Sequence, residues 1–255
     1  MRRGLAVLLA LAAFGVQAAD LKADLKADVK VLSGNGARAA IAELGAQFER
    51  ASGHKVEIQF AVNPEVKKRI DAGEAFDVAV LNPPVLDALI QEGKVRRETR
   101  SVIGRAGIGA AVREGAPRPD ISTVEAFKRT LLSMKSVAYP GEGASGKYFV
   151  SVVERLGIAH EMKPRMRPMP AEYNVEVVAT GEVDMVVVVA SRIAGVKGVQ
   201  FLGGIPAELQ TWIGFTGGVG AKAREPEAAR ALLRFMTAPE AAAVLRRAGV
   251  EPFVE

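Results

Sequence analysis

Short apolar segments alternate with amphipathic segments along most of this chain, and many of the amphipathic segments end at a glycine. Continuously apolar strands that alternate with helices are typical of a parallel sheet covered by helices on both faces. In the first third, this pattern predicts strands over residues 29–32, 56–60 and 77–81, and helices over 38–51, 65–72 and 84–91, which end at Gly53, Gly73 and Gly93. The sequence therefore predicts an α/β fold.

The alternation restarts further along the chain and indicates a second lobe. We expect strands over 108–112, 136–139, 163–169, 185–190 and 199–202, and helices over 124–132, 147–156 and 171–180. The chain then returns to the first lobe through 210–219 and ends in helices over 226–236 and 239–248. We divide it into a first lobe (20–104), a second lobe (105–205) and a return to the first (206–255), with the strands that cross between the lobes as a hinge.

The N-terminus has the features of a secretory signal peptide. Arg2 and Arg3 precede an apolar run over 5–16, and small residues follow at a cleavage position. We expect residues 1–19 to be removed and the mature protein to be periplasmic. The sequence has no cysteine, which excludes disulfides and thiolate metal sites, so its stability depends on a buried core.

The mildly basic charge balance suits a small anionic ligand or the surface of an anionic envelope and does not require nucleic acid. The formal net charge of +5 falls to +3 when Arg2 and Arg3 leave with the signal peptide. The basic cluster at residues 96–100 is interrupted by Glu98 and has no interleaved aromatic side chain. It therefore indicates a solvated connection between the lobes, and we expect no nucleic-acid partner.

A glycine-rich turn is the strongest local indication of a ligand site. Ser122-Thr123 supplies an N-cap for the helix over 124–132, and the strand that follows leads into Glu142-Gly143-Ala144-Ser145-Gly146. Ser145 and Gly146 stand where the next helix begins, so free backbone N–H groups and a hydroxyl would face whatever lies above the strand end. This arrangement is suited to binding an anion.

The run from Gly115 to Phe149 also resembles a known family. Its segments GAPRPDIST, AFKRTLL, SVAYP and GASGKYF are similar to the second lobe of periplasmic solute-binding proteins of ABC importers, of the molybdate-binding type, and the resemblance extends from about Val29 to Pro252. It implies a two-lobed flytrap fold, each lobe with a central, mostly parallel sheet flanked by helices. It also implies a monomer that delivers a small anion to an ABC permease in the inner membrane, without a cofactor or metal.

The candidate ligand-binding residues lie in loops at the carboxyl ends of the predicted strands, where open α/β sheets bind ligands. They are Ser33, Gly34, Asn35, Gly36, Asn63, Asn82, Ser145, Gly146, Tyr173, Asn174, Ser191 and Arg192. Most have an alternative role as helix caps or ordinary turn residues. Against the family pattern, Gly36 and Asn63 or Pro64 take the places of two serines and Val189 that of a tyrosine, so an organic carboxylate is as suitable a ligand as molybdate.

Enzymatic patterns are incomplete in this sequence. Residues 141–147 match the spacing of a phosphate-binding loop, but Tyr148 replaces the Ser or Thr that would hold magnesium. The nucleophile elbow of hydrolases has the pattern G-x-S-x-G, whereas Ser145 lies in G-x-S-G, one residue short. Neither His54 nor His160 is placed to act as a general base. We therefore expect a non-enzymatic binding protein; the alternatives are an exported hydrolase of phosphate or acyl esters and a ligand-sensing subunit of a membrane receptor.

Overall fold

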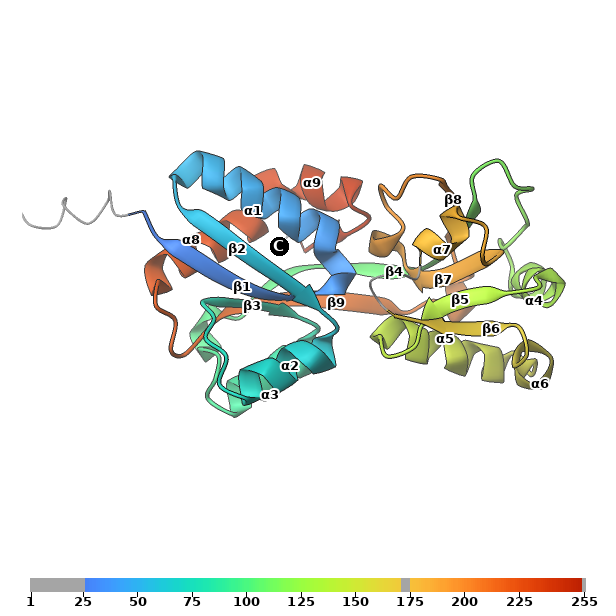
Figure 1. Cartoon of the computed structure of the whole chain (residues 1–255), viewed down its shortest axis with the longest axis horizontal. Helices are drawn as coiled ribbons and strands as arrows, with labels where there is room; N and C mark the ends of the chain where they lie inside the picture. The colour runs from blue at the N-terminus through green and yellow to red at the C-terminus, as the bar shows by residue number, and fades with distance from the viewer. Residues whose placement is uncertain (1–25, 171–174, 254–255) are drawn as a thin grey trace, which may run out of the picture.

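The computed structural model describes residues 26–170 and 175–253, and it has two lobes joined by long strands (Figure 1). The predicted signal peptide lies outside the described residues. The predicted α/β class and two-lobed fold are confirmed. No helix in the described part of the chain combines the length and apolar character needed to cross a bilayer.

The first lobe contains both ends of the described chain. Its strands are β1 (Asp28–Gly34), β2 (Lys55–Ala61), β3 (Val78–Leu81), β9 (Trp212–Val219) and the short β10 (Glu251–Pro252), and its helices are α1 (Arg38–Ser52), α2 (Asn63–Asp71), α3 (Pro83–Gln91), α8 (Pro226–Thr237) and α9 (Ala242–Arg247). Helix α1 ends at Gly53, whose φ of 75° is in the left-handed region, as the glycine pattern predicts.

The second lobe is smaller. Its strands are β5 (Val137–Pro140), β6 (Met166–Met169), β7 (Met185–Val189) and β8 (Val199–Gly204), and its helices are α4 (Val124–Ser133), α5 (Ala144–Arg155), α6 (Ala159–Met162) and α7 (Glu176–Ala179). The Thr123 hydroxyl accepts a hydrogen bond from the backbone N–H of Ala126 and caps α4, as predicted. Helix α7 is shorter than the predicted helix over 171–180, of which residues 171–174 lie outside the described chain.

Short 3₁₀ helices connect several of these elements. They are η2 (Asn35–Ala37), η3 (Arg97–Thr99), η4 (Ala190–Arg192), η5 (Ala207–Leu209) and η6 (Pro239–Ala241). The basic cluster at 96–100 forms η3 and leads into β4 (Ser101–Arg113), and Arg100 pairs with Asp87 of α3.

The main sheet runs in the order β2-β1-β3-β9-β4-β7-β5-β6. Strand β1 is parallel to β2 and β3, and β5 is parallel to β6 and β7, as expected for α/β lobes. The crossing strands β4 and β9 pair antiparallel with each other and with their neighbours. Parallel pairing therefore dominates the outer part of each lobe, while antiparallel pairing joins the lobes.

Strand β4 is much longer than the predicted strand over 108–112. It pairs with β9 from Ser101 to Gly107 and with β7 from Ile108 to Val112, so it passes from one lobe into the other. Gly104, Arg105 and Gly107 interrupt the apolar pattern of its first half, which is why the sequence does not indicate a strand there. The predicted lobe boundary at 104/105 falls within β4, and the one at 205/206 falls between β8 and η5; both stay predictions.

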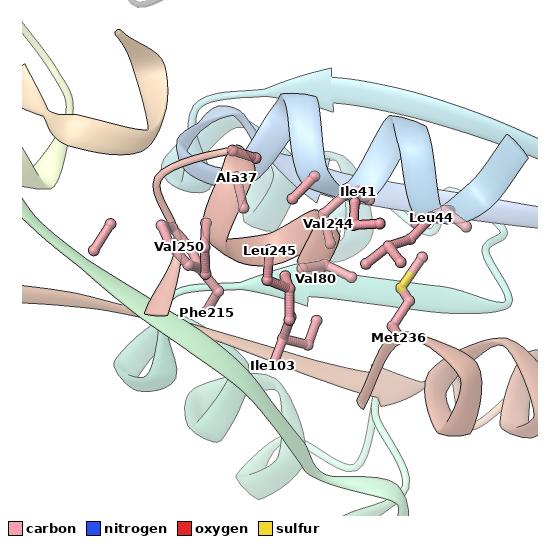
Figure 2. Close-up of a cluster of buried hydrophobic side chains, with 14 of the residues drawn as sticks. Ala37, Ile41, Leu44, Val80, Ile103, Phe215, Met236, Val244, Leu245 and Val250 are labelled. Atoms are coloured by element: carbon pink, nitrogen blue, oxygen red, sulfur yellow. The ribbon is translucent and has the colours of Figure 1, made fainter. Parts of the chain in front are cut away.

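The core of the first lobe lies between its sheet and the C-terminal helices (Figure 2). Ile41 and Leu44 of α1 face Met236 of α8 and Leu245 of α9, and all four are nearly or fully buried. Segments from the two ends of the chain therefore share one core. This packing holds the carboxyl end of β1, and the loop that follows it, in a defined position.

Candidate functional site

A cavity of about 260 Å³ lies between the lobes, at the carboxyl ends of β1, β3, β5 and β7. Both lobes contribute to its wall. Its lining residues are Asn35, Gly36, Val62, Asn63, Pro64, Asn82, Pro84, Val85, Pro140, Glu142, Gly143, Ala144, Ser145, Lys147, Val188, Val189, Arg192 and Ile213. This is the position at which open α/β sheets bind ligands.

Helices α2 and α3 begin at the first-lobe wall. Each has a proline in its first two positions, where the missing N–H costs no helical hydrogen bond. Pro83 and Pro84 of α3 have no N–H, and the next two N–H groups of this helix donate to the Asn82 carbonyl oxygen, so α3 contributes its helix dipole and not free donors. The dipoles of α2 and α3 give this wall a positive electrostatic character.

Asn63 and Asn82 form an interlocked pair in the same wall. Asn63 Nδ2 donates to Asn82 Oδ1 at 2.6 Å, and the backbone N–H of Asn82 donates to Asn63 Oδ1 at 2.9 Å. Asn82 Nδ2 also donates to the carbonyl oxygen of Gly214 in β9, at 2.8 Å. Each primary amide carries a second N–H besides these bonds, so the pair can present donors to a ligand from a rigid support.

The second-lobe wall is the turn between β5 and α5. Helix α5 begins at Ala144 after Gly143, and the buried Ser145 lies in its first turn. The turn is tight because Gly146 packs directly on Pro140; a Cβ atom at Gly146 would lie 1.7 Å from the Pro140 carbonyl oxygen. The N-terminus of α5 therefore points into the cavity. It is the third helix N-terminus to do so, after those of α2 and α3.

Charged side chains of both signs line the second-lobe side. Arg192 in η4 has a side chain only 11% exposed, and its guanidinium lies 3.7 Å from a carboxylate oxygen of Glu176 in α7. Lys147 and Glu142 are exposed at the mouth. A nearly buried guanidinium in the cavity wall is a suitable group for binding a carboxylate or oxyanion.

The structure brings half of the predicted site residues to the cavity. Asn35, Gly36, Asn63, Asn82, Ser145 and Arg192 line it. Ser33, Gly34, Gly146 and Ser191 do not: Ser33 is fully buried and its hydroxyl donates to the Gly34 carbonyl, and Ser191 donates to the Gly36 carbonyl. Tyr173 and Asn174 lie outside the described residues.

Some lining residues were not among the predicted ligand contacts. Lys147 belongs to the incomplete phosphate-loop pattern, so the sequence contained a signal for it. Ile213 comes from β9, some 70 positions after the α5 turn, and no local pattern connects the two. Only the crossing of β9 between the lobes places it there.

Among the described residues, the site contains no histidine and no cluster of metal-ligating side chains. No histidine of residues 26–170 or 175–253 lines the cavity; His54 accepts a hydrogen bond from the Ala27 N–H and stacks on Phe48. The same residues contain no group of three or more His, Cys, Asp or Glu side chains able to hold a metal ion.

A family model described as "Bacterial extracellular solute-binding protein" matches residues 29–251. The chain belongs to this family. The predicted resemblance is thereby confirmed.

This solute-binding protein is also similar to individual known proteins. An aconitate isomerase of a Pseudomonas species is 35% identical over 228 residues, which is 87% of this chain and 87% of that protein. The periplasmic molybdate-binding protein of Azotobacter vinelandii has a TM-score of 0.76 at 17% identity, with 89% of this chain and 100% of that chain covered. A sulfate-binding protein of Mycobacterium tuberculosis has a TM-score of 0.69 at 18% identity, covering 89% and 87%. At such identities, the two structures establish the shared fold alone.

Proposed function

We propose that this protein captures a small organic polyanion, of the carboxylate class, in the cavity between its lobes and delivers it to an ABC-type permease from the periplasm. The observation that carries the proposal is the convergence of three helix N-termini, those of α2, α3 and α5, on a cavity that also contains the guanidinium of Arg192. Helix N-termini and guanidinium groups both favour negative charge.

Three features support a carboxylate over a tetrahedral oxyanion. The planar guanidinium of Arg192 matches a carboxylate with two parallel hydrogen bonds. The relative that is 35% identical is named for aconitate, a tricarboxylate, whereas the molybdate- and sulfate-binding proteins are similar in fold only. Val189 also stands where the molybdate-binding type places a tyrosine.

Isomerisation of aconitate is the second candidate function. The name of the same relative favours it, because the match covers most of both chains. Glu142 and Lys147 are ionisable side chains in the cavity wall, and acid–base chemistry requires such groups within reach of the substrate. A solute-binding fold does not decide between capture and catalysis, because function depends on the site.

A thermal-shift screen of the mature protein tests the ligand class. The panel contains cis-aconitate, trans-aconitate, citrate, molybdate, tungstate and sulfate, since a ligand bound to the native state raises the melting temperature. We expect a shift with the tricarboxylates. A shift with molybdate and tungstate alone would contradict the carboxylate assignment, and no shift with any of them would contradict anion capture.

Proton NMR of the protein with cis- or trans-aconitate separates the two functions. Binding without conversion between the isomers supports capture for transport or sensing. Catalytic conversion, abolished by Arg192→Gln, would make the protein an isomerase. Both outcomes keep the same cavity as the site.

A further inference from the structure

The side chain of Gln210 binds the backbone of β4 in the manner of a strand partner. Its Oε1 accepts from the backbone N–H of Ile108 at 2.6 Å, and its Nε2 donates to the carbonyl oxygen of Ile108 at 2.9 Å. Hydrogen-bonded residue pairs of an antiparallel sheet exchange both bonds in the same way. One side-chain amide therefore satisfies both backbone groups of a residue that is fully buried.

Ile108 is the residue at which β4 changes lobes. Gly107 is the last residue of β4 paired with β9, opposite Trp212, and Ile108 is the first one paired with β7, opposite Val189. Gln210 itself lies between η5 and β9, in the segment that returns the chain to the first lobe. The Gln210 amide therefore links β4 to the segment that leads into β9, at the point where both leave the second lobe.

Two glycines leave room for this amide. A Cβ atom at Gly107 would lie 3.1–3.2 Å from the amide atoms of Gln210, and one at Gly204 would lie 3.2 Å from its Nε2. These distances are shorter than ordinary carbon contacts, so a side chain at either position would press on the amide. The surroundings are thus fitted to a glutamine that lies flat against the backbone.

Helix α5 is tied to the same segment. The Tyr148 hydroxyl donates to the carbonyl oxygen of Leu209 at 2.9 Å, and Arg155 Nη2 donates to that of Glu208 at 3.3 Å. Tyr148 lies one turn after Ser145, at the end of α5 that lines the cavity. Residues 208–210 are therefore bonded both to β4 beyond Gly107 and to the helix that would bind the anion.

We infer that Gln210 and Tyr148 are positioning residues that confine the bending between the lobes to Gly107 in β4 and Thr211 before β9. Segment 205–210 moves with the second lobe, because its bonds go to Ile108 and to α5. Closure then carries the N-terminus of α5 toward Asn63 and Asn82 along one defined path. The functional part of this inference rests on the proposed function, because a defined path matters for a ligand held by both lobes.

Distance measurements between spin labels on the two lobes test the inference. The sequence has no cysteine, so Lys68→Cys on α2 and Glu154→Cys on α5, both exposed, provide the only two labelling sites. With Gln210 present, we expect a narrow distribution without ligand and a shorter distance with trans-aconitate. Gln210→Leu should broaden the ligand-free distribution and weaken trans-aconitate binding by about tenfold, because fewer molecules hold the competent arrangement.

Two further variants separate positioning from stability. Tyr148→Phe keeps the packing of α5 but loses the bond to Leu209, and it should broaden the distribution in the same way. Gln47→Leu, on the exposed face of α1, is the matched control and should leave both readouts unchanged. Narrow distributions identical to the unsubstituted chain in both Gln210→Leu and Tyr148→Phe would overturn the inference. Because the ligand-free distances test the hinge alone, a protein that does not bind trans-aconitate would contradict only the proposed ligand.

Discussion

The hydroxyl of Ser191 donates a hydrogen bond to the backbone carbonyl oxygen of Gly36, at 2.5 Å and across 155 positions of the chain. Ser191 lies in η4 beside Arg192, and Gly36 lies in η2 in the cavity wall. The bond therefore connects the loop after β1 to the loop after β7, and so the first lobe to the segment that carries the guanidinium.

Replacing Ser191 by alanine should destabilise the protein. Ser191 is buried, so water cannot easily replace the lost donor, and we expect the free energy of unfolding to fall by about 1–2 kcal/mol. Urea unfolding measures this. Ser133→Ala removes a hydroxyl that bonds a helix-end carbonyl in an exposed position, and it should have a much smaller effect. Equal losses in the two variants would contradict a special role for the bond to Gly36.

Replacing Arg192 by glutamine should weaken anion binding by about 30-fold, which corresponds to about 2 kcal/mol for a charge-assisted contact. Titration calorimetry with the anion that gives the largest thermal shift measures the affinity. Arg247→Gln is the control, because the side chain of Arg247 is 62% exposed and pairs with Glu43 away from the cavity. An unchanged affinity in Arg192→Gln would place the charge contact elsewhere.

Replacing Asn63 by aspartate should lower anion affinity at least ~10-fold. The new carboxylate has the same shape, but it puts negative charge in the cavity and an oxygen where Asn63 Nδ2 now donates to Asn82. Gln47→Glu, the same chemical change on an exposed helix face, controls for net charge. The interpretation fails if both variants bind the anion as tightly as the unsubstituted protein.

Replacing Gly146 by alanine should disrupt the α5 turn. The added Cβ atom would lie 1.7 Å from the Pro140 carbonyl oxygen, so the helix must move, and we expect a loss of about 3 kcal/mol or more. Gly141→Ala is a matched control in the same turn, since its Cβ atom would have its nearest contact at 3.4 Å. Thermal melting compares the two, and a Gly146→Ala protein as stable as Gly141→Ala would show that the turn can relax.

Stability should depend on Glu74 in acid. Hydrogen bonds from the Arg69 guanidinium and then from the Lys30 ammonium lower the pKa of Glu74 from 4.5 to about 2. Because the pKa is lower in the folded state, these contacts stabilise the protein above about pH 4.5, and this contribution is lost as the pH falls from there to about 2. Glu74→Gln should therefore be less stable than the unsubstituted protein at pH 7 and nearly equal to it near pH 2. Urea unfolding measures the difference in the free energy of unfolding between Glu74→Gln and the unsubstituted protein. If this difference is the same at pH 7 and near pH 2, the stabilising role of the Glu74 carboxylate is contradicted.

Much of the local structure follows from the sequence because it depends on neighbours along the chain. The left-handed glycine that ends α1, the Thr123 cap of α4 and the apolar strands β3 and β7 all depend on residues within a few positions. The polar turns after the strands likewise indicated Asn63, Asn82 and Ser145 as candidate site residues, since strand ends in an open α/β sheet face the ligand.

Only the tertiary structure decided the roles that depend on distant partners. In the folded protein, the Ser191 hydroxyl bonds the Gly36 carbonyl, and Gly146 packs against Pro140. Strand β4 extends through Gly104 and Gly107 because β9 supplies the pairing that the local pattern does not indicate. The order of apolar and polar residues along the sequence determined an α/β chain with polar strand ends. Which of those polar groups face the cavity depends on contacts between residues up to 155 positions apart, and local periodicity contains no information on such contacts.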